Sequence, residues 1–184
     1  MRKPLFRIIA GLAAALTLLA GPAAQAADLA LIASGGKNGA RPGLAEDLID
    51  AYTEAGYQVI DGRGADRAAL IGLLEDFEFD GIGADRLVIH LIGPLAESGG
   101  LPFYLPRGAT ASSLTEIMAQ GLPLQLFLDL VDRGEGKGML ALSITNFREQ
   151  PADGLRAPPG VLLMRGFPMA VNAAVIDQML RNRR

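Results

Sequence analysis

Short apolar runs alternate with longer segments of helical period along this chain of 184 residues. Apolar runs of about four to eight residues between Gly and Pro signals predict buried strands. Apolar residues spaced by about three and four positions predict helices. We predict six strands, at residues 28–33, 57–60, 86–92, 123–128, 139–144 and 161–164. We predict four helices, at residues 43–55, 65–77, 112–120 and 170–180.

This order of elements predicts an α/β fold. Strands that alternate with helices form a largely parallel sheet with helices on its faces, so we expect a three-layer sandwich around a mostly parallel six-stranded sheet. The run at 86–92 is almost continuously apolar and rich in branched residues, which is typical of a central strand covered on both faces. Sites in such sheets form at the carboxyl ends of the strands, here the loops after Ala33, Ile92 and Leu128.

The first 26 residues have the pattern of a secretory signal peptide. A basic start with Arg2, Lys3 and Arg7 precedes an apolar stretch at 8–19, and residues 24–26 read Ala-Gln-Ala, a small-residue cleavage site. We therefore expect cleavage after Ala26, a periplasmic or secreted location in a bacterium, and a single mature domain at residues 27–184. An uncleaved amino-terminal anchor is the alternative. No other apolar run approaches the length of a membrane span.

The charge balance restricts the partners. Three of the 17 basic residues and none of the 20 acidic ones lie in the first 26 positions, so the mature chain carries 14 basic against 20 acidic residues, a net charge of −6. An acidic chain without a basic run is not expected to bind nucleic acid.

Four strings, in this order, resemble motifs of the caspase and metacaspase family of cysteine peptidases. RPGLAED at 41–47 resembles that family's entry to its first helix. ADRLVIHLIGP at 84–94 resembles the strand that delivers the catalytic histidine, and GLPFYLP at 100–106 the hairpin that follows it. LFLDLVDRG at 126–134 resembles the segment that delivers the nucleophilic cysteine. The resemblance spans about residues 29–144 and implies a caspase-like fold.

Matching residue by residue implies that both catalytic positions are replaced. Gly93 matches the glycine before the histidine, so the histidine position is Pro94. Asp129 matches the aspartate two positions before the cysteine, so the cysteine position is Val131. The family's chemistry needs a thiolate and an imidazole, which valine and proline do not supply. The chain has no cysteine, and its one histidine, His90, precedes Pro94 by four strand residues, or roughly 13 Å. We expect His90 to be a core or sheet-face histidine with a hydrogen-bond partner.

Other chemistries have weaker support. A serine hydrolase would need His90 beside Ser34, Ser98 or Ser143, and the chain has no Gly-x-Ser-x-Gly motif. Histidine or cysteine metal clusters are excluded by the counts. The acidic run from Glu75 to Asp80 lacks calcium-loop spacing and is interpreted as a solvated helix end. The Gly-rich loop at 34–39 lacks a nucleotide-binding motif, so we predict no metal and no cofactor.

The sequence therefore predicts an exported, catalytically inactive caspase-like domain that binds an unidentified peptide or protein. The expected cleft consists of Ser34, Lys37, Arg41, Gly93, Pro94, Asp129, Val131, Asp132 and Arg133. One alternative is a hydrolase of another class that uses Asp129 or Asp132. Another is a structural module that pairs through an edge strand or through the last helix.

Overall fold

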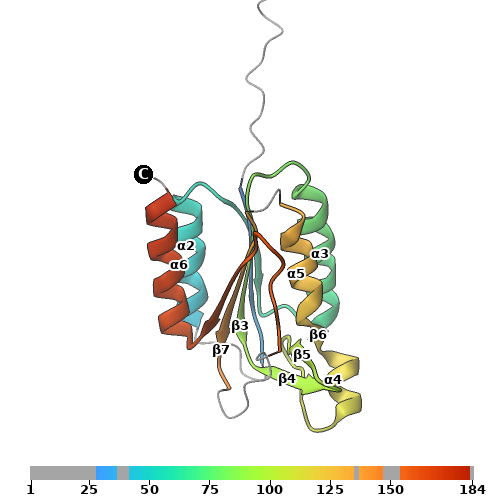
Figure 1. Ribbon diagram of the computed structural model, residues 1–184. Coiled ribbons are helices and arrows are strands. Elements are labelled where there is room, and N and C mark those ends of the chain that lie inside the picture. Colours follow the sequence, from blue (N-terminus) through green and yellow to red (C-terminus); the bar gives the residue numbers. More distant parts are fainter. Residues whose placement is uncertain (1–27, 37–41, 135–136, 147–153, 183–184) are drawn as a thin grey trace, which may run out of the picture.

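A parallel sheet of five strands forms the centre of the computed structural model, which describes residues 28–36, 42–134, 137–146 and 154–182. The strand order is β2-β1-β3-β7-β8, and every neighbouring pair is parallel. Helices α2 and α6 cover one face and helices α3 and α5 cover the other (Figure 1). The three-layer α/β fold is confirmed, but the central sheet has five strands instead of six.

The helices and strands follow one another along the chain in nearly the predicted order. The central strands are β1 (Leu29–Ser34), β2 (Gln58–Arg63), β3 (Leu87–Gly93), β7 (Met139–Ile144) and β8 (Leu162–Gly166). A small second sheet contains β4 (Leu95–Ser98), β5 (Leu101–Tyr104) and β6 (Leu122–Pro123). The helices are α2 (Pro42–Glu54), α3 (Arg67–Asp80), α4 (Leu114–Gln120), α5 (Leu124–Asp132) and α6 (Pro168–Asn182).

Alternate residues of the central strands enter two different cores. In β1, Leu29 and Leu31 pack with α3 and α5, whereas Ala30 and Ile32 pack with α2 and α6. Every residue of β1, β3 and β7 is buried, as expected for strands that have helices on both sides.

The fourth predicted strand, at 123–128, is wrong, because residues from Leu124 onward belong to helix α5. Leu124, Phe127, Leu128 and Val131 are buried and lie at the spacing of one helix face. Gln125 on the other face is exposed, and its Nε2 donates to Asp129 Oδ1 one turn later, at 2.7 Å. The segment also alternates apolar and polar residues, which is why its pattern was compatible with a strand.

The small sheet and α4 form a projection at the end of the molecule where the central strands finish (Figure 1). The hairpin within 94–106 is confirmed as β4 and β5. Ser113 caps the start of α4, because its Oγ accepts from the Glu116 backbone N–H at 3.2 Å. The Glu116 carboxylate accepts from Ser112 N and Thr110 Oγ1.

Several predictions concern residues outside the described ranges. The signal segment at 1–26 is one, and the proposed cleft residues Lys37 and Arg41 are others. Within the described ranges, no helix combines the length and hydropathy that a membrane span requires.

Candidate functional site

The carboxyl ends of β1, β3 and β7 lie side by side. A site was predicted at the first two of these ends, whereas the third predicted position, after Leu128, lies within helix α5. Ser34 pairs with Ile92 across β1 and β3, and Gly93 pairs with Ile144 across β3 and β7. We call this end of the sheet the carboxyl edge. The segments that follow these three strands therefore begin next to one another.

Pro94 and Tyr104 pack against Gly35 and Gly36, the two residues that follow β1. A Cβ atom on Gly36, where φ is +95°, would lie 2.9 Å from Pro94 Cδ. A Cβ on Gly35 would lie 2.7 Å from the Tyr104 hydroxyl oxygen and would overlap the Leu105 carbonyl. The Tyr104 hydroxyl donates to Ile92 O at 3.4 Å, and complete burial raises the pKa of Tyr104. The position that the resemblance assigns to a catalytic histidine thus holds a proline ring packed on a glycine.

Ser34 has a structural partner at this edge. Its Oγ accepts a hydrogen bond from the Gly64 backbone N–H at 3.2 Å, and the residue is only 7 % exposed. Gly64 follows β2, so Ser34 joins the ends of β1 and β2. Among the residues that the structure describes, no basic side chain hydrogen-bonds to Ser34.

Thr145 and Asn146 occupy the carboxyl edge after β7, and the sequence interpretation missed both. The Thr145 N–H donates to Gly93 O at 3.0 Å. The Asn146 side chain accepts from Leu95 N at 2.8 Å and donates to Leu95 O at 2.6 Å, so one amide pairs with the backbone of β4. The available signal was a polar pair directly after the buried strand at 139–144.

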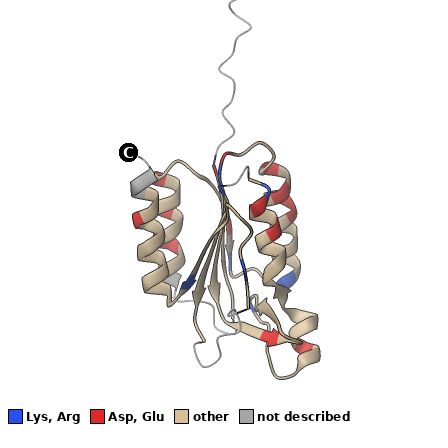
Figure 2. Ribbon diagram, viewed as in Figure 1, with Lys and Arg blue, Asp and Glu red and all other residues tan. Residues whose placement is uncertain are grey.

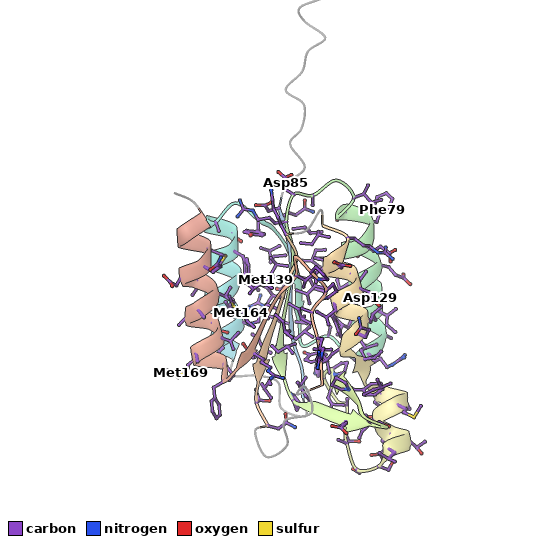
Figure 3. All side chains as sticks on the ribbon, viewed as in Figure 1. Phe79, Asp85, Asp129, Met139, Met164 and Met169 are labelled. Atoms are coloured by element: carbon purple, nitrogen blue, oxygen red, sulfur yellow. The ribbon has the colours of Figure 1, made fainter. Side chains whose placement is uncertain are left out.

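The residues predicted from the segment 126–134 do not belong to this edge. Val131 is fully buried on helix α5, so its assignment as the cysteine position is wrong. Asp129 is exposed along the same helix, on the outer side in Figure 3. Asp132 and Arg133 end the helix, and Arg133 pairs with Glu78 of α3.

The structure thus divides the predicted cleft into two groups. It brings Ser34, Gly93 and Pro94 together, and it places the four residues from α5 elsewhere. Helix α5 starts beside the small sheet at the carboxyl edge and runs back along the central sheet. The alternative hydrolase that uses Asp129 and Asp132 at strand ends therefore loses its geometric basis.

His90 lies in the core, as predicted. It is 0 % exposed, and its Nε2 lies 2.8 Å from Ser143 Oγ on the neighbouring strand β7. Ser143 Oγ in turn donates to Asn172 Oδ1 of α6 at 3.0 Å. Burial lowers the pKa of His90 to about 3, so the ring is neutral. A serine and a histidine are therefore hydrogen-bonded here, as a serine hydrolase would need. However, Ser143 is also 0 % exposed, and among the described residues no carboxylate contacts the other ring nitrogen of His90.

A shallow pocket of about 360 Å³ lies next to the carboxyl edge. It is lined by the start of α3, the segment after β5 and the end of α4, including Asp66, Arg67, Arg107 and Gln120. Arg107 Nη1 donates to Gly64 O at 3.4 Å, and Gly36 bridges to Arg107, so this pocket adjoins the loops of β1 and β2. Asp66 already caps α3 by accepting from Ala69 N at 2.9 Å. The pocket therefore offers two guanidinium groups to an incoming ligand.

Within the described ranges, no three acidic, histidine or cysteine side chains converge in a way that could hold a metal ion.

Comparison with solved structures identifies the fold. The chain is similar to the Drosophila initiator caspase Dronc, with a TM-score of 0.51 and 11 % sequence identity over 73 % of this chain. The match covers 52 % of the caspase chain, so it spans about half of that structure. No model of a known protein family matches the sequence, and no curated protein matches it either. The chain thus has a caspase-like fold, which this likeness establishes without establishing an activity.

Proposed function

We propose that this chain is an exported, catalytically inactive caspase-like protein that binds a peptide or protein segment at the carboxyl edge of its sheet. One observation carries the proposal. The chain has a caspase-like fold but contains no cysteine, and its single histidine is fully buried in the middle of a strand.

The chemistry of the carboxyl edge supports inactivity. Covalent peptide cleavage needs a nucleophile with an adjacent base, and the pair must reach solvent. Ser34 and Thr145 supply hydroxyl groups at this edge, but His90 is buried and bonded to Ser143. Pro94, to which the resemblance assigns the histidine position, has no titratable group, and its ring lies against Gly36.

The pocket beside this edge supports binding. Guanidinium groups recognise carboxylates through charge-assisted hydrogen bonds, and both Arg67 and Arg107 are exposed. Arg67 Nε donates to Gly121 O at 3.5 Å, and Arg107 donates to Gly64 O, so each side chain has one backbone anchor. We infer that the bound segment carries an acidic side chain.

The proposal is tested with the chain from residue 27 and blocked peptides of Ala and Val that contain one central Asp. The matched peptide contains Asn instead. We expect the Asp peptide to bind more tightly, and Arg107→Ala and Arg67→Ala each to weaken it about tenfold, as loss of a charge-assisted contact does. Arg63→Ala is the matched control, because Arg63 is also exposed but pairs with Asp61 on the edge strand. Equal affinity for the Asp and Asn peptides would contradict the proposal.

A further inference from the structure

A second, larger pocket lies at the opposite end of the sheet, between the ends of α3 and α5. Its volume is about 510 Å³, and its floor is formed by the buried residues Phe77, Leu87 and Leu130. Phe79 and Ile82 line it as well and are 76 % and 77 % exposed. Single exposed apolar residues are common on protein surfaces, but two large ones beside an apolar pocket indicate an interaction site.

Phe79 lies in the last turn of α3, and Ile82 lies on the turn that follows the helix. Gly81 N donates to Phe77 O at 3.0 Å and Ala84 N donates to Gly81 O at 3.1 Å, which fixes the path of the chain between the helix end and β3. Phe79 projects outward at the end of α3 in Figure 3. A partner would therefore meet a backbone that already presents both apolar residues, so binding does not require the chain here to be ordered.

Acidic residues dominate the two helices that border the pocket, as Figure 2 shows. The exposed carboxylates on α3, on the turn that follows it and on α5 are Glu75, Asp76, Glu78, Asp80, Asp85, Asp129 and Asp132. Among the described residues that line the pocket, Arg133 is the one basic side chain, and it is paired with Glu78. The net field around the apolar centre is therefore negative.

An apolar pocket surrounded by carboxylates favours one class of binding partner. A second copy that docked through this same surface would bring the same carboxylates against it, and nucleic acid or an anionic lipid surface would also be repelled. We infer that the pocket is a docking site for a basic segment of a partner protein that inserts an apolar side chain between Phe79 and Ile82. The inference goes beyond the proposed function, because it concerns a different end of the sheet and does not depend on the carboxyl edge.

The test uses the chain from residue 27 and a synthetic peptide of Leu and Lys with the leucines at helical spacing. Two matched peptides replace every Lys by Glu or every Leu by Ser. We expect the Leu/Lys peptide to bind, with an affinity that decreases as salt is added, and both matched peptides to bind at least tenfold more weakly. The double variant Phe79→Ser/Ile82→Ser should lose at least tenfold in affinity, and Glu75→Lys several-fold.

Two control variants distinguish binding at this surface from nonspecific binding. Met169→Ser removes an apolar side chain that is 79 % exposed at the start of α6, and Asp47→Lys reverses an exposed charge on α2. Both should bind the Leu/Lys peptide as the parent chain does. The inference is overturned if that peptide does not bind, if the controls weaken it as much as the pocket variants, or if the chain forms a dimer that Phe79→Ser/Ile82→Ser abolishes.

Discussion

At the scale of single residues, the buried histidine has the most direct consequence for pH dependence. The pKa of His90 is lowered to about 3 by burial, whereas an unfolded chain titrates its histidine near the ordinary value of 6.5. Between these two pH values the unfolded state binds the proton more readily, so His90 destabilises the fold as the pH decreases. Above the ordinary value the histidine is neutral in both states and contributes no slope.

We therefore predict that His90 contributes about 2 kcal/mol to the loss of stability between pH 7 and pH 5. Urea unfolding of the parent chain and of His90→Gln at both pH values measures this contribution. The variant is expected to be less stable at pH 7 because its core hydrogen bonds change, but to lose about 2 kcal/mol less than the parent on acidification. An identical pH dependence in both chains would show that His90 titrates alike in the folded and unfolded states, which would contradict its burial as a neutral ring.

Asn146 is the residue that joins the ends of β7 and β4. Asn146→Ala leaves the N–H and C=O of Leu95 without their partner, which we expect to cost about 1–3 kcal/mol. Asn146→Asp keeps an acceptor for Leu95 N but cannot donate to Leu95 O, so it is also destabilising at neutral pH. Hydrogen exchange at the Leu95 amide separates the variants: Ala should speed exchange strongly and Asp only weakly. Equal protection in both variants would contradict the observed pairing.

At the scale of elements, a helix at α5 predicts unequal effects on stability for two substitutions that would have similar effects in a strand. In a strand, Leu126 and Leu128 would share one face, whereas in the helix Leu128 is fully buried and Leu126 is 36 % exposed. Leu128→Ala should therefore cost about 2–5 kcal/mol in the free energy of unfolding and Leu126→Ala less than about 1 kcal/mol. Similar losses for the two variants, measured by chemical denaturation, would favour the strand.

The same helix marks the limit of what the sequence could predict. The strands at 86–92 and 139–144 were recognisable because short, almost continuous apolar runs are typical of central strands covered on both faces. The segment from Leu124 to Val131 supports both periods, and tertiary packing on β3 and β7 decides between them. Once that segment was interpreted as a strand, its end was taken for a catalytic loop and Val131 for a catalytic position.

The candidate site was predictable only in part for a related reason. The carboxyl ends of β1 and β3 were located correctly, so Ser34, Gly93 and Pro94 lie together as expected. Asn146 and the pocket residues Arg67 and Arg107 were not predicted, because their roles depend on contacts with segments that are distant in the sequence. Local patterns carry no information on such contacts.

At the scale of the whole molecule, the two candidate surfaces lie at opposite ends of one sheet and have opposite charge preferences. The pocket at the carboxyl edge presents Arg67 and Arg107, and the pocket between α3 and α5 is bordered by carboxylates. Mutations at one pocket should leave binding at the other unchanged, because distant sites without shared partners behave independently.

Export is also a property of the whole chain. We predict that the protein recovered from the periplasm or medium of an expressing bacterium starts at Ala27, because the small-residue site at 24–26 directs cleavage there. Intact mass spectrometry measures the new terminus. A full-length chain held in the membrane fraction would instead favour the uncleaved anchor.

The central claim, a caspase-like fold that binds without cleaving, is tested most directly by one incubation. The chain from residue 27 is mixed with the Asp-containing peptide, and the peptide mass is followed while amide shifts of the protein are recorded. The account predicts shifts around Ser34, Arg107 and Asn146 with every peptide bond intact. Cleavage by the parent chain that Ser34→Ala or Thr145→Ala abolishes would contradict it and would identify the protein as a peptidase.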